Sequence, residues 1–239
     1  MQLIGLLGGM SWQSSAEYYR LLNQIVQRRQ DGLHSARCLL YSVDFAAVER
    51  MQVEGRWDDA ANALTGAAQV LEAAGVDFIV LCTNTMHKVA DQVQAAVDVP
   101  LLHLADTTAV VVKEHRIGRV GLLGTIFTMT DSFYRDRLAS HGLDVIVPSP
   151  EDQRVVNDII YDELCKGIIL PRSRKRYRDI IERLVEMGAE GVIYGCTEIE
   201  LLVDESDSNV PVFPTTRLHC EAAADRAMGA GIVRRPLLP

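Results

Sequence analysis

The sequence predicts an α/β protein built from two similar lobes, each a parallel sheet flanked by helices. Three segments recur in the same order and at nearly constant separation. The matched pairs are Ile4–Gly9 with Val120–Thr125, Ala74–Thr83 with Met187–Cys196, and Val99–Leu102 with Val210–Phe213. Each copy of the second pair reads as a helix ending at Gly, an apolar run of strand length and then small polar residues. The repetition indicates an internal duplication.

The first half of the chain alternates between strands and helices. Apolar runs bounded by Gly, Pro or polar residues predict its strands, and longer periodic stretches predict its helices. Glycines at 8 and 9 follow the first strand, and Gly75 ends the long third helix. The expected strands are 2–7, 37–43, 77–81 and a short one after Pro100, and the expected helices are 14–29, 45–53, 57–74, 86–97 and one through His115.

The second half repeats this order from residue 119. Its expected strands are 120–123, 143–147, 191–194 and 210–213, and its expected helices are 131–140, 151–165, 171–187 and 215–228. Strands that alternate with helices form parallel sheets, with ligands at the carboxyl ends of the strands. We therefore predict two Rossmann-like lobes related by a pseudo-twofold axis, residues 1–115 and 116–213, with the active site in the cleft between them. The helical segment 214–239 is expected to pack back on the first lobe.

Composition narrows the classes of function. A net charge of −8 argues against binding to nucleic acid or to an anionic membrane, because such surfaces are recognised mainly by clustered Lys and Arg. No run of residues reaches transmembrane length. Five cysteines, an odd number without CxxC or zinc-type spacing, indicate reduced thiols in a cytoplasmic protein and give a metal site little support.

The loop Gly8-Gly9-Met10-Ser11 joins the first strand to the first helix. Glycines at such a point let the backbone approach a ligand and aim helix N–H groups at an anion. The spacing is not GxGxxG, so a dinucleotide is a weak prediction. A carboxylate is a better match in size.

Cys196 follows a predicted strand and precedes Thr197, Glu198 and a short helical segment. A thiol at a helix N-terminus is acidified and can act as a base or nucleophile. Taken alone, the residue could equally be a small hydrophobic side chain at a sheet edge. The internal repeat favours the functional interpretation.

The matching point of the first lobe is Thr83, with Asn84 and Thr85 after it. The repeat aligns Cys82 with Gly195, and alternation along a strand turns Cys82 and Thr83 to opposite sides, so Cys82 is expected in the core. The hydroxyl and amide groups at 83–85 could hold a carboxylate or carbonyl. Capping of the next helix is the alternative. His87, one turn further on, could orient Thr83.

Three motifs carry a resemblance to a known family. They are Gly8-Gly9-Met10-Ser11, Cys82-Thr83-Asn84-Thr85-Met86-His87 and Gly195-Cys196-Thr197-Glu198. Over nearly its whole length the chain resembles the aspartate/glutamate racemase family, especially its broad-specificity amino-acid racemase branch. The resemblance implies catalysis without pyridoxal phosphate or any other cofactor, with one acid/base residue on each side of the substrate α-carbon. Both are usually cysteines.

The resemblance implies that Cys196 is the second catalytic residue and that Thr83 stands where the first cysteine belongs. It places Met10, Gln52, Thr197 and Glu198 at substrate-binding or supporting positions. A threonine hydroxyl is a poor base near neutral pH. Because the second-lobe cysteine of the family takes the proton from the L substrate, we expect turnover that favours L-amino acids.

The resulting hypothesis is a racemase for aspartate, glutamate or a related amino acid, with Thr83 and Cys196 as the catalytic pair. Assembly as a homodimer is expected from the family and from the frequency of dimers in general. The groups expected to hold the substrate are Met10, Ser11, Gln52, Thr83, Asn84, Thr85, Gly124, Thr125, Thr197 and Glu198.

Two other classes of function are compatible with this pattern. A single thiol would suit a decarboxylase or isomerase of the same superfamily. Loss of the first cysteine would also suit a protein that binds an amino acid without catalysis.

Overall fold

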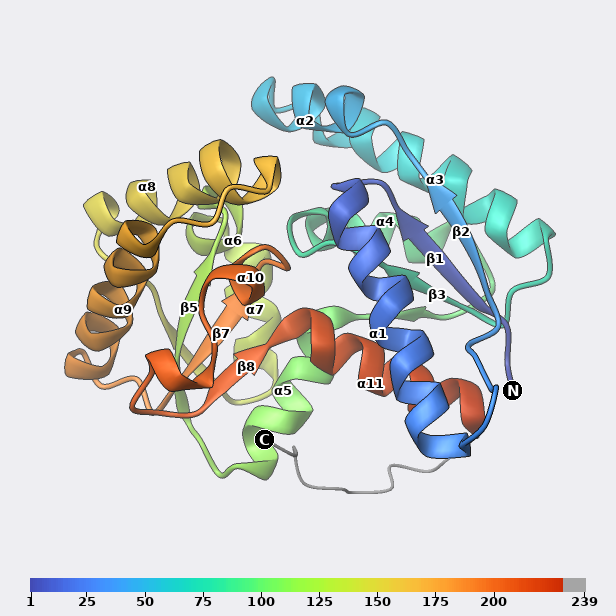
Figure 1. Ribbon diagram of the computed structural model, residues 1–239. Coiled ribbons are helices and arrows are strands. Elements are labelled where there is room, and N and C mark those ends of the chain that lie inside the picture. Colours follow the sequence, from blue (N-terminus) through green and yellow to red (C-terminus); the bar gives the residue numbers. More distant parts are fainter. Residues whose placement is uncertain (230–239) are drawn as a thin grey trace.

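Two separate parallel sheets form the centre of the molecule (Figure 1). The structure, a computed structural model, describes residues 1–229, so the predicted segment 230–239 lies outside the described residues. The first sheet has the order β2-β1-β3-β4, with β1 (Ile4–Gly8), β2 (Cys38–Ser42), β3 (Phe78–Leu81) and β4 (Leu101–Leu102). The second has the order β6-β5-β7-β8, with β5 (Arg119–Gly124), β6 (Asp144–Ile146), β7 (Gly191–Gly195) and β8 (Val212–Pro214). The two sheets have the same strand order, as the predicted duplication requires.

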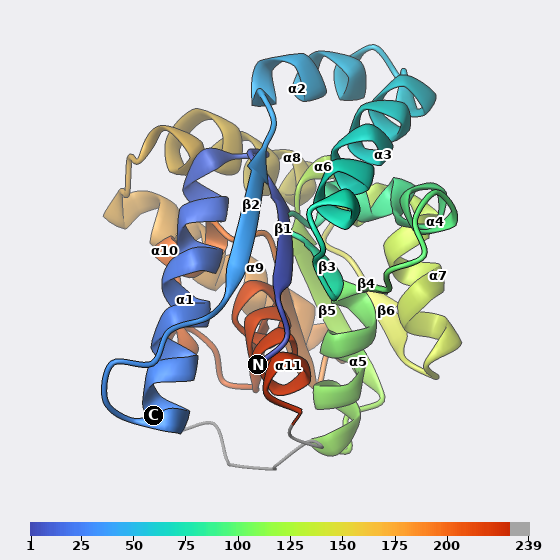
Figure 2. The ribbon, with the colours of Figure 1, turned by 90° about the vertical axis from the view of Figure 1, so that its right-hand side faces the viewer.

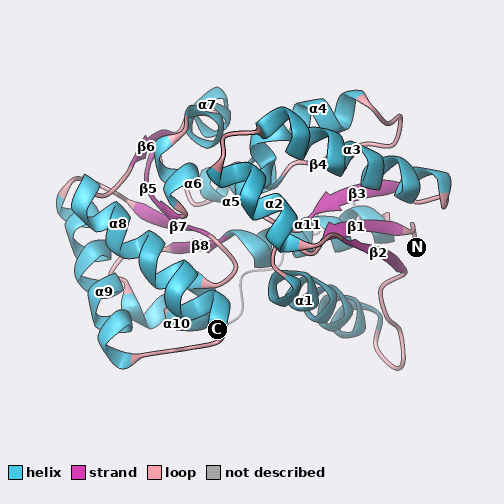
Figure 3. Ribbon diagram, turned by 90° about the horizontal axis from the view of Figure 1, so that it is seen from above, coloured by secondary structure: helices cyan, strands magenta, loops and turns pink. Residues whose placement is uncertain are grey.

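Helices cover both faces of each sheet, and the view from above shows the two layered units side by side (Figure 3). The helices of the first half are α1 (Trp12–Gln30), α2 (Phe45–Val53), α3 (Trp57–Ala73), α4 (Ala90–Ala95) and α5 (Leu104–Glu114). Those of the second half are α6 (Ile126–Thr130), α7 (Ser132–Ser140), α8 (Pro150–Asp158), α9 (Pro171–Glu186), α10 (Ile199–Leu202) and α11 (Thr215–Met228). The core strands are buried on both faces, which accounts for their continuous apolar runs.

Two helices cross from one half of the chain to the other. α5 follows β4 of the first sheet, yet Leu104 and Val112 pack with Val120 and Ile193 of the second sheet. α11 follows β8 of the second sheet, and its Cys220 and Ala224 lie in the core of the first sheet beside Tyr18 of α1. Figure 1 shows α11 running alongside α1. This exchange of α5 and α11 ties the two halves of the chain together. The division of the chain into lobes at residues 115/116 therefore stays a prediction.

Two predicted helices are less regular in the structure than the sequence indicates. The predicted helix 86–97 is a 3₁₀ turn, Thr85–Val89, followed by α4. The predicted helix 151–165 ends as α8 at Asp158 and continues as a π turn, Ile159–Glu163, and a 3₁₀ turn, Leu164–Lys166. Turns of the π type occur frequently at functional sites. Both segments contribute residues to the cavity described below.

The loop after β1 depends on one glycine. Gly9 has a φ of +96°, and a Cβ there would lie 2.3 Å from the carbonyl oxygen of Val43. Only glycine fits this conformation and this close approach. Ser15 fixes the loop further, since its Oγ accepts a 2.7 Å hydrogen bond from Gly9 N. The loop therefore passes close to the end of β2 and fixes where α1 begins. β2 faces the viewer in Figure 2.

No helix within residues 1–229 is both long enough and apolar enough to span a membrane.

Candidate active site

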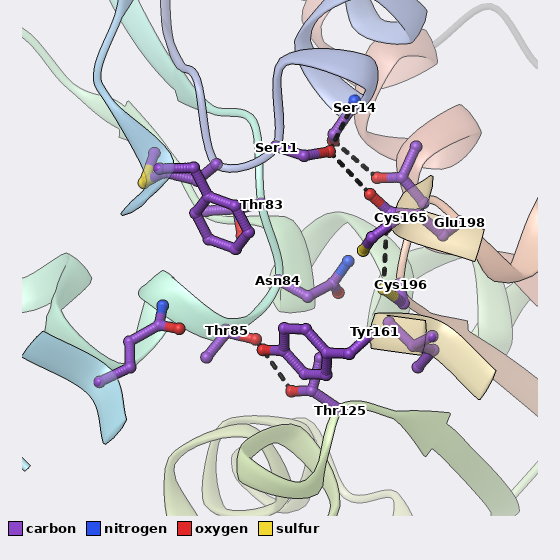
Figure 4. A pocket seen from close by; sticks show the side chains of 15 residues that line it. Ser11, Ser14, Thr83, Asn84, Thr85, Thr125, Tyr161, Cys165, Cys196 and Glu198 are labelled. Carbon is purple, nitrogen blue, oxygen red and sulfur yellow. Dashed lines mark hydrogen bonds between the residues drawn. The ribbon is translucent and has the colours of Figure 1, made fainter. Parts of the chain in front are cut away.

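A cavity lies where the carboxyl ends of the strands of both sheets meet, as parallel sheets predict (Figure 4). Its walls come from the loops after β1, β3, β5 and β7, from the first turn of α1, from α2, and from the π and 3₁₀ turns after α8. The lining residues are Met10, Ser11, Ser14, Phe45, Gln52, Thr83, Asn84, Thr85, Thr125, Ile160, Tyr161, Cys165, Cys196, Thr197 and Glu198.

A buried carboxylate joins the two lobes at this cavity. Glu198 Oε2 accepts a 3.0 Å hydrogen bond from the Cys196 thiol, and Glu198 Oε1 accepts a 2.8 Å bond from Ser11 Oγ of the opposite lobe. Ser11 also caps α1, since its Oγ accepts from Ser14 N. These two bonds satisfy both oxygens of a side chain that is only 6% exposed.

Cys196 is held as a thiol rather than as a thiolate. Burial raises its pKa well above the usual value, and the neighbouring Glu198 carboxylate raises the pKa further, both by its charge and by accepting the thiol proton. The expected acidification of Cys196 by a helix N-terminus is therefore wrong. α10 has only four residues, and a carboxylate rather than a cation stands beside the sulfur.

Thr83 lies on a different wall from Cys196, at the end of β3 (Figure 4). Its backbone carbonyl oxygen lies 2.7 Å from His87 Nδ1, and His87 Nε2 accepts a 3.1 Å bond from Leu104 N. His87 thus donates from Nδ1 and stays neutral, because burial lowers its pKa well below the usual value. It orients the backbone of Thr83. The Thr83 hydroxyl has no hydrogen-bond partner among the described residues, and no base activates it.

Hydroxyl groups close the cavity across the two lobes. Thr85 Oγ1 lies 2.9 Å from Thr125 Oγ1, and Ser14 Oγ lies 2.8 Å from Thr197 Oγ1. Each pair joins a residue of the first lobe to one of the second. The cavity is therefore bounded by short polar side chains that can exchange hydrogen bonds with a bound ligand.

The other residues predicted to hold the substrate differ in their position relative to the cavity. Asn84 lines it, but its amide nitrogen donates to Thr215 Oγ1 at 3.1 Å. Gln52 lines it and donates to Met86 Sδ at 2.9 Å. Gly124 does not line it; a Cβ there would lie 2.9 Å from Gly195 O, so glycine allows the ends of β5 and β7 to approach closely.

Cys82 lies in the apolar core of the first sheet, as predicted, and does not line the cavity. Burial raises the pKa of its thiol. The alternation that separates it from Thr83 in the sequence also separates them in the structure.

Five lining residues were not predicted from the sequence: Ser14, Phe45, Ile160, Tyr161 and Cys165. Three of them belong to the irregular turns after α8, which the sequence pattern presents as ordinary helix. Cys165 is partly buried, and burial raises its pKa to about 12. Gln13 of α1 reaches this segment across the lobes, donating to Cys165 O at 3.2 Å. Ser14 lies three residues after Ser11, the last residue of the Gly-Gly-Met-Ser motif, and this closeness is the signal that could have identified it.

The walls leave about 30 Å³ of free volume, which has room for only a few water molecules. Separation of the two lobes would enlarge this space. The interlobe hydrogen bonds of Ser11, Ser14 and Thr85 are the contacts that such a movement would change. Within residues 1–229 no group of three or more His, Cys, Asp or Glu side chains has an arrangement suited to a metal ion.

The fold and the cavity define a class: a two-lobed α/β protein whose interlobe site presents a thiol and a hydroxyl from opposite lobes. The sequence matches the Asp/Glu/hydantoin racemase family over residues 7–223. The chain belongs to this family.

Relatives support this assignment over nearly the whole chain. A crystal structure of a candidate Asp/Glu racemase from Yersinia pestis is similar, with 53% sequence identity, a TM-score of 0.90 and coverage of 95% of this chain and 100% of that chain. An aspartate racemase homologue from Pyrococcus horikoshii OT3 has 33% identity, a TM-score of 0.85 and the same coverages. The broad-specificity amino-acid racemase RacX of Bacillus subtilis is 25% identical over 222 residues, 90% of this chain and 93% of RacX.

The contact between Cys196 and Glu198 gives a testable prediction. Glu198→Gln removes the negative charge beside the sulfur, so the pKa of Cys196 should fall relative to the unmodified protein. The pH dependence of thiolate ultraviolet absorbance measures this shift. The same titration on Cys196→Ser and on Glu198→Gln/Cys196→Ser subtracts the other four thiols. An unchanged Cys196 titration would show that burial alone holds the proton.

Proposed function

We propose that the protein racemises an amino acid without a cofactor, that Cys196 is the base on one face of the substrate and that Thr83 lies on the other. The observation that carries the proposal is the buried pair of Cys196 and Glu198, placed across the interlobe cavity from Thr83 in a member of this racemase family. The substrate is aspartate, glutamate or a related amino acid, and the L enantiomer is favoured.

The proton transfer can be written for these residues. Cys196 must first lose its thiol proton, and Glu198 Oε2, 3.0 Å away, is in position to accept it. The positive α-ammonium group of a bound amino acid would favour the thiolate by offsetting the negative charge of this pair. The thiolate then removes the α-proton, and the C–H electron pair stays on the substrate as a carbanion conjugated with its carboxyl group. The Thr83 hydroxyl relays a proton from solvent water to the opposite face of the carbanion, which gives the opposite enantiomer, and solvent takes up the proton that Cys196 removed.

The remaining wall stabilises the charge that develops on the substrate carboxyl group. Thr85, Thr125 and Asn84 line the cavity, are each at most 6% exposed and offer hydroxyl and amide donors. Such donors act most strongly when they are already oriented towards the developing charge. Met10 and Ser11, held by the loop around Gly9, complete this side of the cavity.

Because the two walls of the cavity differ chemically, the L and D enantiomers should exchange their α-protons at different rates. In D₂O the α-proton of the L enantiomer should exchange much faster than that of the D enantiomer, because Cys196 can become a thiolate whereas Thr83 has no base beside it. Cys196→Ser should lower L exchange by about 10²- to 10⁴-fold. Proton NMR of aspartate and glutamate enantiomers measures both rates.

Two variants of Thr83, on the wall opposite Cys196, form the matched pair for this experiment. Thr83→Cys should raise exchange of the D enantiomer, whereas Thr83→Ser, which keeps a hydroxyl, should not. Equal rates for both enantiomers in the unmodified protein would contradict the proposal. Absence of exchange together with carbon dioxide release from substituted malonates would assign the thiol to a decarboxylase, and absence of both would leave ligand binding alone.

The charges of the cavity bear on the choice among these amino acids. Among the described residues that line it, none is Arg, Lys or His, and the only charged side chain is the acidic Glu198. A second carboxylate on the substrate would meet no cation there. Burying an unpaired carboxylate is unfavourable by several kcal/mol or more. We therefore expect the neutral amides to be better substrates than the acids of the same shape.

Asparagine and aspartate provide an isosteric comparison. kcat/KM for exchange of the L α-proton should be at least about tenfold higher for asparagine, because its side chain carries no charge into the cavity. Glutamine and glutamate repeat the comparison at a greater chain length. A preference for the acids in both pairs would show that a cation outside the described lining enters the site.

We also propose that two copies of the chain associate through the edge of the first sheet. β2 is an edge strand of five uncharged residues, and Leu39, Leu40 and Tyr41 are 36%, 48% and 37% exposed. Figure 2 shows β2 facing outwards between α1 and α3. Apolar edge strands left open in this way pair readily with another strand.

The other three sheet edges are protected against such pairing. β4 has two residues and follows Pro100, β6 begins at Asp144, and β8 ends at Pro214. Short length, charge and proline are the usual means of blocking an edge. β2 is also complementary to itself: in antiparallel pairing about a twofold axis at Leu40, Leu39 faces Tyr41 of the partner subunit.

Leu40→Lys should convert a dimer into a monomer, because it places a charge on each strand at the axis. Sedimentation equilibrium measures the change. Leu33→Lys is the matched control, since Leu33 is 99% exposed but lies outside the strand. A Leu40→Lys protein that remains dimeric would place the interface elsewhere, and an unmodified protein that is monomeric would contradict the association.

A cytoplasmic location is part of the same proposal. It is supported by the cysteines, because all five are free thiols.

A further inference from the structure

A second contact between the lobes lies beside the cavity, outside its lining. The Lys88 ammonium group lies 3.8 Å from the centre of the Trp57 ring and donates a 2.7 Å hydrogen bond to Asp131 Oδ2. The Trp57 ring also meets the Phe127 ring edge to face, with 5.4 Å between the ring centres. Trp57 and Lys88 belong to the first lobe, and Phe127 and Asp131 belong to the second. These four side chains form the rim contact, which combines an ion pair, a cation–π contact and an aromatic pair.

The rim contact is joined directly to two segments of the cavity wall. Lys88 lies in the 3₁₀ turn that begins at Thr85, and Thr85 lines the cavity. Phe127 lies in α6, whose N-cap residue is Thr125, which also lines the cavity. The hydroxyl groups of Thr85 and Thr125 face each other at 2.9 Å (Figure 4). The rim contact therefore holds together the same two segments as this pair of threonines.

Lys88 is the central member of the rim contact, because it touches a partner in each lobe. Trp57 packs against the apolar core of the first sheet, which fixes its ring. The ammonium group stands over this ring and reaches Asp131 from there. The side chains of Lys88 and Asp131 are only 28% and 29% exposed. Solvent and salt screen such a pair less than one on the open surface.

The lobes are linked in two different ways. The exchange of α5 and α11 joins them through packed apolar cores. Around the cavity, in contrast, they meet through single pairs of side chains, which are the hydroxyl pairs, the bond of Ser11 to Glu198 and the rim contact. A movement of one lobe against the other would break these pairs before it disturbed either core. Closure of two lobes around a ligand is a common motion in proteins.

We infer that Lys88 is a positioning residue that clamps the two lobes together beside the cavity, so that Thr85 and Thr125 face the same ligand. It does not line the cavity and acts through the wall segments on either side of the rim contact. Its effect on turnover rests on the proposed racemase function. Its effect on the closure of the lobes does not.

Fluorescence tests the closure without any assay of turnover. The chain has two tryptophans, so Trp12→Phe leaves Trp57 as the single reporter. In this background Asp131→Asn should increase the quenching of Trp57 by acrylamide. The variant leaves Lys88 over the ring, but the lobes separate more often and Phe127 then no longer covers its edge.

Asp144→Asn in the same background is the matched control. Asp144 pairs with Arg119 at 2.5 Å, and both residues belong to the second sheet. Loss of this pair removes a carboxylate without loosening a contact between the lobes, so the quenching should not change. Equal quenching in Asp131→Asn and in the Trp12→Phe parent would overturn the inference.

Kinetics of α-proton exchange test the consequence for the cavity. Lys88→Met, which keeps the length of the side chain and removes its charge, should raise KM for the L substrate by up to about tenfold, because it lowers the closed fraction of the protein. kcat should change by less than about twofold, since the closed state presents the same groups to the substrate. Lys88→Arg keeps a cation that can stack on the Trp57 ring and should restore KM.

The two experiments separate the inference from the proposed function. An unchanged KM in Lys88→Met, or a fall in kcat that Lys88→Arg does not restore, would overturn the role of Lys88 as a clamp. Increased quenching in Asp131→Asn in a protein that exchanges no α-proton would contradict only the proposed function.

Discussion

The buried carboxylate of Glu198 is the interaction on which the arrangement of the cavity depends. A carboxylate so well shielded from water must have both oxygens satisfied, and here the two donors come from different parts of the chain: Cys196 beside it and Ser11 across the cleft. One side chain thus raises the pKa of the Cys196 thiol and draws the two lobes together. Separation of the lobes would break the bond between Ser11 and Glu198, whereas the bond between Cys196 and Glu198 lies within the second lobe.

The two walls of the cavity are chemically unequal although the lobes that carry them are duplicates. On one wall a thiol is coupled to a carboxylate that can take its proton. On the other, Thr83 presents a hydroxyl held only through its backbone, by His87. A duplicated scaffold offers the symmetry that racemisation needs, with a group on each face of the α-carbon. This chain retains the geometry and makes the chemistry of the two faces different.

Much of this arrangement was predictable because it depends on local pattern. The repeat aligned Thr83 with Cys196 without any knowledge of distance, since equivalent positions in duplicated sheets come to equivalent strand ends. The cavity residues that escaped prediction, Tyr161 and Cys165 among them, sit on turns whose sequence is compatible with ordinary helix. Periodicity reports which residues are apolar and how they are spaced, and a π turn changes that spacing by a single residue.

The sequence by itself determined the two-sheet architecture, the strand ends that bear chemistry and the exclusion of Cys82 from the site. These follow from burial and alternation, which each segment carries in its own residues. Only the tertiary structure decided the protonation of the cavity side chains and the partners of their hydrogen bonds. It gave Cys196 a carboxylate neighbour, joined Ser14 to Thr197 and Thr216, and exchanged α5 and α11 between the sheets. Glu198 is only two residues from Cys196, but its contact with the thiol and the contact of Ser14 with Thr197 depend on side-chain placement that folding alone decides.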